Sequence, residues 1–166
     1  MNEQDLKIGE AGQVYVVTAV GRANFEYAVP IRELVNSNEG RKTIRVDLKE
    51  CTAMDSTFMG VLSMGGLKAA DNGSSFEIYN ASEALKRCLA DLGVDELFVF
   101  RDGSPGVIDG AGSLPGKADM LATAETVEEA HRKLVEADSA NAGRFNAVID
   151  LAAADVGRLK NQNNDK

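Results

Sequence analysis

The chain has 166 residues, a length that suits one domain with an appendage. Hydrophobic residues make up 44% of it and aromatic residues only 5%, so we expect an aliphatic core. The net charge of −8 argues against nucleic acid and anionic membrane as partners, and it favours a partner with basic contact residues.

The N-terminal residues are polar and acidic, unlike a signal peptide. No apolar run approaches the roughly 20 residues of a membrane span. We therefore expect a soluble cytoplasmic protein. The two cysteines, Cys51 and Cys88, lack metal-ligand spacing and lie in apolar contexts, so we expect small core residues and neither a disulfide nor a metal site.

Residues up to 100 alternate between strand and helix patterns. Apolar and β-branched runs predict strands at 13–20, 42–49, 75–79 and 96–100. Apolar residues at helical spacing predict helices at 25–38, at 56–70 and within 82–93, where Ser82 is the cap and Gly93 the end. This alternation indicates an α/β layer whose strands are joined by right-handed crossovers.

The composition changes after Arg101. Residues 101–119 hold five glycines and two prolines, a pattern typical of a linker. A capping box formed by Thr126 and Glu129 then predicts the start of a helix, and helical spacing predicts another helix at about 142–159.

The predicted organisation is therefore a domain at 1–100, a Gly/Pro-rich linker at 101–120 and a helical C-terminal extension at 121–166. The apolar faces of the extension must pack on the domain, on a second copy or on a partner. We favour packing on the domain, because each helix is too short to be stable alone.

The run Met54-Asp55-Ser56-Thr57 lies where a strand passes into a helix. Such a helix start exposes unpaired N–H groups and the positive end of the macrodipole. In one interpretation these acid and hydroxyl side chains only cap the helix. In the other, Ser56 carries a phosphate that the N–H groups accommodate beside the Asp55 carboxylate.

Residues 13–100 resemble the STAS domains of bacterial anti-sigma factor antagonists. The resemblance lies in Met54-Asp55-Ser56-Thr57 before a helix, in the following SFEIYNAS, and in the LADLGVDELF ending. It implies an α/β fold with a STAS-like mixed β-sheet flanked by helices, and no catalysis by the domain itself. It also implies that Ser56, with Thr57 as the alternative, is phosphorylated by a partner.

That partner, by the same resemblance, is a serine kinase with an ATPase-type fold that doubles as an anti-sigma factor. The unphosphorylated protein binds it, phosphorylation releases it, and a metal-dependent serine phosphatase reverses the mark. We accordingly expect a partner-binding surface formed by a small group of residues. They are Asp55, Ser56, Thr57, Phe58 and Asn24.

Two of these positions depart from the family pattern. Phe58 stands where family members usually carry a glycine, so it either obstructs the usual partner or gives a different one an apolar anchor. Asn24 stands where the loop commonly has an acid, which weakens the contact role carried over to it.

No catalytic residue, metal ligand or cofactor site is predicted. His131, the only histidine, is expected to be exposed on a charged helix face beside Arg132 and Lys133. Gly65-Gly66 lies within a helix pattern, which indicates close helix packing and not a phosphate-binding loop.

Two alternatives to the phosphorylation switch remain open. One is a STAS scaffold that binds partners through the C-terminal helices and uses no serine switch. The other is a small enzyme or ligand-binding protein built on Asp55, Ser56 and Asn80, although no histidine, lysine or cysteine pair is expected to join them.

Overall fold

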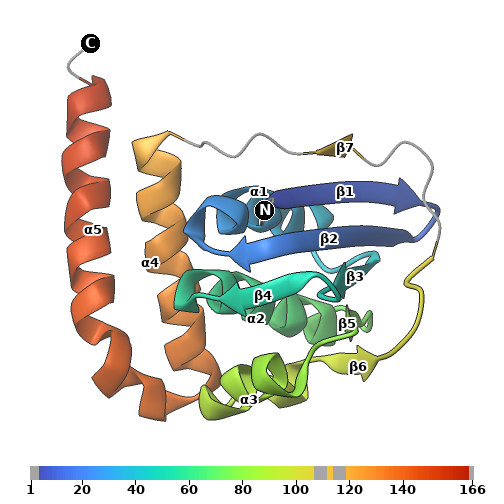
Figure 1. The fold of residues 1–166 in the computed structure, drawn as a ribbon. Helices are drawn as coiled ribbons and strands as arrows, with labels where there is room; N and C mark the ends of the chain where they lie inside the picture. Colours follow the sequence, from blue (N-terminus) through green and yellow to red (C-terminus); the bar gives the residue numbers. More distant parts are fainter. Residues whose placement is uncertain (1–3, 107–111, 114–118, 165–166) are drawn as a thin grey trace.

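The computed structural model describes residues 4–106, 112–113 and 119–164. The strands within these ranges are β1 (Asp5–Ala11), β2 (Val14–Ala23), β3 (Thr43–Asp47), β4 (Cys51–Met54), β5 (Phe76–Tyr79), β6 (Val99–Arg101) and β7 (Gly112–Ser113). They form a mixed sheet in the order β6-β5-β3-β2-β1-β7, and β4 pairs separately with the end of β2 (Figure 1).

The helices alternate with the central strands and then form a C-terminal pair. The α-helices are α1 (Phe25–Asn38), α2 (Ser56–Asp71), α3 (Glu83–Asp91), α4 (Met120–Ala137) and α5 (Ala142–Asn164), with short 3₁₀ helices at Asp95–Leu97 (η1) and Ser139–Asn141 (η2). The predicted strand–helix alternation is confirmed. None of the described helices is both long and apolar enough to cross a membrane.

The N-terminal segment adds a strand that the sequence pattern did not reveal. β1 pairs antiparallel with β2 along its whole length, from Asp5 opposite Val20 to Ala11 opposite Val14. β2 then continues through Gly21–Ala23, beyond the predicted strand end at residue 20, and a register shift between Gly21 and Arg22 accompanies its pairing with β4 there. The parallel pairing of β2 with both β3 and β4 sets the edge from which α1 and α2 start.

The core between the sheet and the helices is mainly aliphatic, as the composition predicted. Val17, Val46 and Ile78 from neighbouring strands are fully buried. The expected close packing at the double glycine is also confirmed, because a β-carbon at Gly65 would lie 2.7 Å from Cδ2 of Phe76.

The cysteines differ from each other. Cys51 is buried, as expected, but Cys88 is exposed, so the expectation of a second core cysteine was wrong. Cys88 lies on a short helix that buries only Leu85 and Leu89. The apolar residues near Cys88 in the sequence therefore lie on the opposite face of α3.

A buried carboxylate links the sheet to the segment that follows it. Glu77 on β5 accepts hydrogen bonds from Nε of Arg45, at 2.7 Å, and from Nε of Arg101, at 2.8 Å. Arg45 also donates to the carbonyl of Pro105. Burial alone would raise the pKa of Glu77, but the two guanidinium hydrogen bonds outweigh burial and hold that pKa below its usual value.

The C-terminal helices begin and end at different residues from those predicted. α4 begins at Met120, where the Asp119 side chain accepts from the Ala122 N–H, so the proposed cap at Thr126 was wrong. Thr126 lies inside the helix, and its hydroxyl donates to the Ala122 carbonyl. The predicted linker lies partly outside the described residues, at 107–111 and 114–118, and its Gly112–Ser113 pairs with β1.

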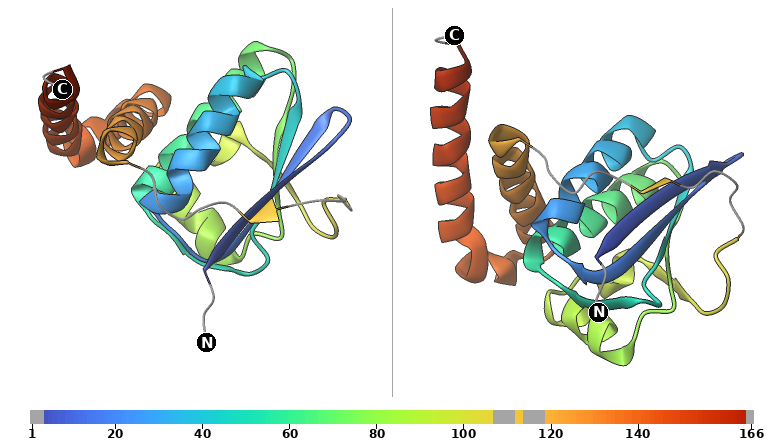
Figure 2. Two further views of the ribbon diagram at one scale, coloured as in Figure 1. Left: turned by 90° about the horizontal axis from the view of Figure 1, so that it is seen from above. Right: turned by 45° about the horizontal axis from the view of Figure 1, so that its top comes forward.

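α4 and α5 form an antiparallel hairpin beside the helical layer (Figure 2). α4 packs on α2 and, less extensively, on α1, whereas α5 packs on α4. Ala130 and Leu134 of α4 are fully buried. The expectation that the extension packs on the domain itself is therefore confirmed.

Candidate partner-binding site at the start of helix α2

One carboxylate organises the starts of two helices. The Asp55 side chain accepts from the Phe58 N–H through Oδ1 and from the Phe25 N–H through Oδ2, both at 2.8 Å. Asn24 caps α1 in its turn, accepting from the Glu26 N–H at 3.0 Å. The structure thus brings Asn24 and Asp55 together, and both side chains are engaged in helix capping.

Ser56 is the first residue of α2 and is partly exposed. Its Oγ lies 2.8 Å from Nε2 of His131 on α4. Nδ1 of that histidine lies 2.6 Å from the carbonyl of Val127, an oxygen that can only accept. In a neutral imidazole Nδ1 therefore carries the proton, and Nε2 accepts from the Ser56 hydroxyl.

The position of His131 corrects two expectations. Its side chain is 2% exposed, not displayed on a charged face, and it does join the serine that was expected to have no histidine near it. The ring also contacts that of Phe145 on α5, with centroids 5.0 Å apart. The spacing carried a signal, since His131 is three residues before the buried Leu134 and therefore shares its helix face.

The residues after Ser56 turn inward. Thr57 is 6% exposed and Phe58 is fully buried among the core side chains. Phe58 therefore neither blocks nor anchors a partner in this conformation, which corrects its assignment to a partner surface. Its aromatic ring fills the layer between the helices and the sheet instead.

A close helix crossing lies one turn further along α2. A β-carbon at Gly60 would lie 2.7 Å from the carbonyl carbon of Ala130 and 2.8 Å from its β-carbon. The crossing therefore depends on a glycine on α2 and a small residue on α4. Sequence reasoning missed Gly60, because a lone glycine in a helix pattern does not identify the helix that approaches it.

Polar contacts hold the hairpin at two further places. Nε of Arg32 on α1 lies 2.7 Å from Glu129, and Nη2 lies 3.6 Å from Glu125. At the other end, the buried Asn141 side chain donates to the carbonyls of Leu92 and Leu134. These contacts fix α4 across the first half of α2.

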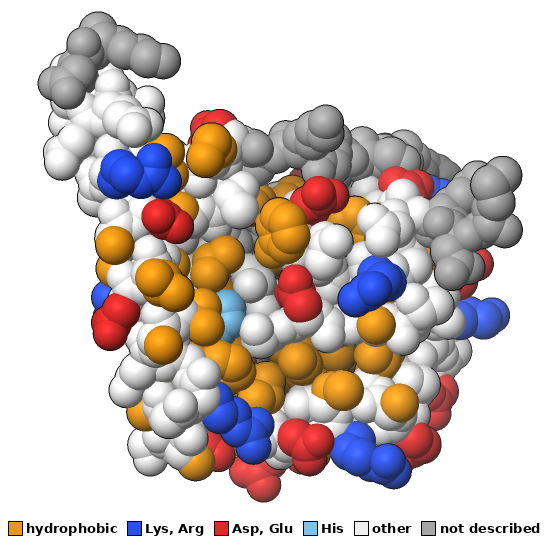
Figure 3. Space-filling view, turned by 60° about the vertical axis from the view of Figure 1, so that its left-hand side comes forward, with side chains coloured by type: hydrophobic (Ala, Val, Ile, Leu, Met, Phe, Trp, Pro, Cys, Tyr) orange, Lys and Arg blue, Asp and Glu red, His pale blue; other side chains and the backbone are white. Residues whose placement is uncertain are grey.

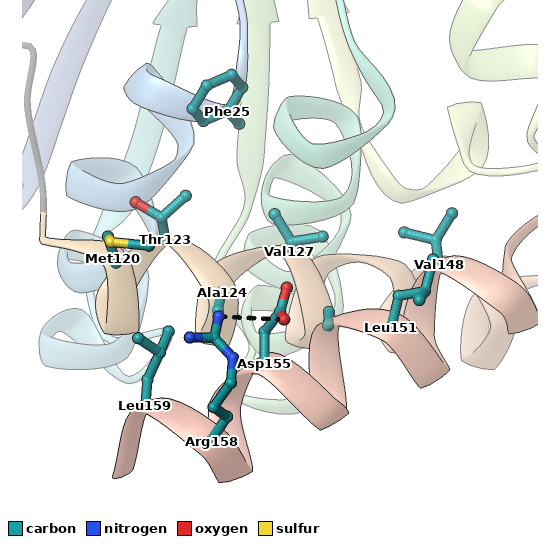
Figure 4. A pocket seen from close by; sticks show the side chains of 11 residues that line it. Phe25, Met120, Thr123, Ala124, Val127, Val148, Leu151, Asp155, Arg158 and Leu159 are labelled. Carbon is teal, nitrogen blue, oxygen red and sulfur yellow. Dashed lines mark hydrogen bonds and ion pairs between the residues drawn. The ribbon is translucent and has the colours of Figure 1, made fainter. Parts of the chain in front are cut away.

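The hairpin also carries an apolar surface of its own (Figure 3). A groove of about 500 Å³ lies between α4, α5 and the start of α1. In Figure 4, Met120, Val127 and Leu151 line it, with Phe25 at one end and the Asp155–Arg158 pair at its edge. Leu151 is 70% exposed and Met120 is 67% exposed, which is unusual for large apolar side chains.

The chemistry available at this site is limited. A serine hydroxyl donating to imidazole resembles an activated nucleophile, but acyl transfer also needs space for a substrate. The lining of the apolar groove does not include Ser56 or His131. Within the described residues, no cluster of three or more His, Cys, Asp or Glu side chains could hold a metal ion.

The comparisons with known proteins agree with this architecture. The family model for the MlaB-type STAS domain matches residues 6–100, so the chain belongs to the STAS domain family. A search of curated proteins found no match.

Among solved structures, the unphosphorylated anti-sigma factor antagonist SpoIIAA is 13% identical, with a TM-score of 0.50, over 60% of this chain and 88% of that chain. Bacillus SpoIIAA in its phosphorylated form is 14% identical, with a TM-score of 0.51, over 60% of this chain and 92% of that chain. The Thermotoga maritima protein TM1081 is 17% identical, with a TM-score of 0.50, over 59% of this chain and 86% of that chain. The predicted STAS-like fold is thus confirmed.

Proposed function

We propose that this protein is a phosphorylation-gated binding module of the anti-sigma factor antagonist type, acting in the cytoplasm without catalysis of its own. The unphosphorylated form binds an anti-sigma factor that is also a serine kinase with an ATPase-type fold. Phosphorylation of Ser56 releases this partner, and a metal-dependent serine phosphatase restores binding. The observation that carries the proposal is Ser56 at the first position of α2, directly after the Asp55 cap.

The physical basis of the switch is electrostatic. A phosphoserine carries about −1.5 to −2 charges at neutral pH. On Ser56 these charges sit at the positive end of α2 but also beside the Asp55 carboxylate. Since Asp55 is fixed by two backbone N–H groups, the backbone stays in place and the change falls on the surface that a partner contacts.

The experiment starts with capture of the partner by Ser56→Ala protein, followed by affinity measurement for Ser56→Ala and Ser56→Asp. We expect the aspartate to weaken binding by at least tenfold, because a charge is placed in an interface. Ser104→Asp, at an exposed loop serine, is the matched control and should leave affinity unchanged. Phosphate found by mass spectrometry only at residues other than Ser56 would remove the switch role from this serine.

A second function is favoured by the exposed groove on the hairpin. In this case the protein is a STAS scaffold that uses α4 and α5 for binding and has no serine switch. Leu151→Glu, which places a charge in the groove, should then abolish partner binding while Ser56→Asp leaves it intact. The opposite pattern supports the switch.

The enzymatic alternative has a direct assay. If the Ser56–His131 pair were a nucleophilic dyad, a fluorophosphonate probe would label Ser56 in the native chain and not in a His131→Ala variant. We expect no labelling in either protein, since the imidazole is buried against Ser56 of α2 and Phe145 of α5.

A further inference from the structure

We propose that the first half of α2 is a helix-binding surface and that the α4–α5 hairpin occupies it in competition with the partner. This inference rests on the proposed function and adds the kind of partner. The partner would present an amphipathic helix with a small residue over Gly60 and a hydrogen-bonding side chain opposite Ser56. The model for that helix is α4 itself.

The contacts of α4 define what this surface recognises. Ala130 sits against Gly60 at a distance that no larger residue on α2 would allow. His131 bonds to Ser56, and Leu134, one turn beyond Ala130, is fully buried. Small, polar and large apolar side chains thus follow one another along one stripe of a helix, which is a common form of helix recognition.

Gly60 itself points to a surface kept open for close approach. Glycine in a helix interior is less favourable than alanine, by about 1 kcal/mol. Gly60 is buried, so solvent exposure does not explain its presence. The approach of another helix backbone does, and α4 supplies that helix in this conformation.

The hairpin is an addition to the domain and not part of its minimal fold. The family match ends at residue 100, before the hairpin begins. The solved chains with the same fold are 86% to 92% covered by about 60% of this chain, so the STAS fold forms without such an extension. Because this added hairpin lies across Ser56, it is placed to compete with a partner for the same surface.

Hairpin docking and phosphorylation of Ser56 exclude each other in this geometry. The 2.8 Å between Oγ of Ser56 and Nε2 of His131 leaves no room for a phosphoryl group between them. The kinase and the docking partner therefore both need α4 to move away. Apparent affinity then scales with the fraction of molecules in which the hairpin is open.

The test uses a fluorescein-labelled peptide with the sequence of residues 119–138 and measures its binding to the full-length chain by fluorescence anisotropy. The wild-type chain should bind it weakly, because its own α4 occupies the surface. Glu129→Ala in the chain removes the 2.7 Å ion pair to Arg32 from the hairpin but not from the peptide, so this variant should bind the peptide about fivefold more tightly. Arg132→Ala, which breaks only an ion pair within α4, is the matched control and should behave as wild type.

A second variant guards against misfolding of the first. Asn141→Ala removes two hydrogen bonds at the far end of the hairpin and should also raise peptide affinity. A peptide with Ala130→Leu should lose at least tenfold in affinity for either variant, because its side chain would meet the α2 backbone beside Gly60. Hydrogen exchange of residues 120–137 in the same variants, measured without the peptide, reports how far the hairpin has opened.

Two results would overturn the inference. One is faster exchange in α4 of Glu129→Ala without tighter peptide binding, which means that the uncovered surface does not bind helices. The other is exchange in α4 that stays tied to global unfolding in both variants, which means that the hairpin is a permanent part of the fold. Neither result depends on phosphorylation, so the proposed serine switch stands or falls separately.

Discussion

Replacement of Gly60 by alanine tests the crossing of α2 and α4, because the sign of the change in the free energy of unfolding depends on whether α4 lies against Gly60. In an unobstructed helix this substitution stabilises by about 1 kcal/mol. Here the new β-carbon would lie 2.7 Å from the carbonyl carbon of Ala130, and backbone cannot yield as a flexible side chain does. Overpacking of this kind costs about 2–3 kcal/mol, so we expect a net loss of about 1–2 kcal/mol.

The measurement is the free energy of unfolding from urea denaturation, followed by circular dichroism. Gly157→Ala is the matched control, because Gly157 lies within α5 and a β-carbon there meets nothing within 4 Å. We expect the control to stabilise by about 0.5–1 kcal/mol. The two glycine-to-alanine variants should therefore change stability in opposite directions and differ by about 1.5–3 kcal/mol.

A Gly60→Ala variant as stabilised as Gly157→Ala would refute the reasoning. It would mean that α4 does not lie against α2 in solution. The helix-binding surface inferred above would then lose its model helix, and Ser56 would lose its contact with His131.

Three further predictions concern the domain itself. Asp55→Ala removes the cap of α2 and the acceptor for the Phe25 N–H at the start of α1, and it should cost about 2 kcal/mol in free energy of unfolding. The exposed Asp150→Ala should stay within about 0.5 kcal/mol, and equal effects of the two substitutions would contradict the double role of Asp55. The lowered pKa of Glu77 means that its stabilising contribution is complete above its ordinary value of 4.5 and is lost as the pH falls through the lower folded-state value. Urea titrations from pH 7 to pH 3 should thus show a smaller acid-dependent loss in Glu77→Gln than in wild type, and parallel curves would argue against the paired carboxylate. Native protein should react with one equivalent of Ellman's reagent, at the exposed Cys88, and with a second only on unfolding, since burial both covers Cys51 and raises the pKa of its thiol; two fast equivalents would show that Cys51 is accessible.

Much of the α/β part was predictable because its signals are local. The range predicted for α1, 25–38, agrees with the structure, and Asp55 and Ser82 cap the helices they were expected to cap. β1 and β4 were missed, since one is largely polar and the other only four residues long. Both are strands because β2 offers them hydrogen-bonding edges, which no local pattern shows.

Only part of the candidate site could be predicted from local sequence patterns. Asp55 and Ser56 stood out because strand, acid, hydroxyl and helix follow one another along the chain. The residues that cover Ser56 come from 75 positions further on, and their pattern fits any amphipathic helix. Phe58 was wrongly assigned to the partner surface for a related reason. The residue type indicates a large apolar side chain but does not show on which face of α2 that side chain lies.

The amino-acid sequence by itself determined the alternating domain, its aliphatic core and a hydroxyl at the start of a capped helix. These follow from side-chain periodicity and capping, which act over a few neighbouring residues. Only the tertiary structure decided that His131 would meet Ser56 and that Ala130 would lie on Gly60. The physical reason is that the docking of one helix on another depends on how the side chains of both faces fit together. The sequence pattern of one helix does not show which face of another helix it will meet.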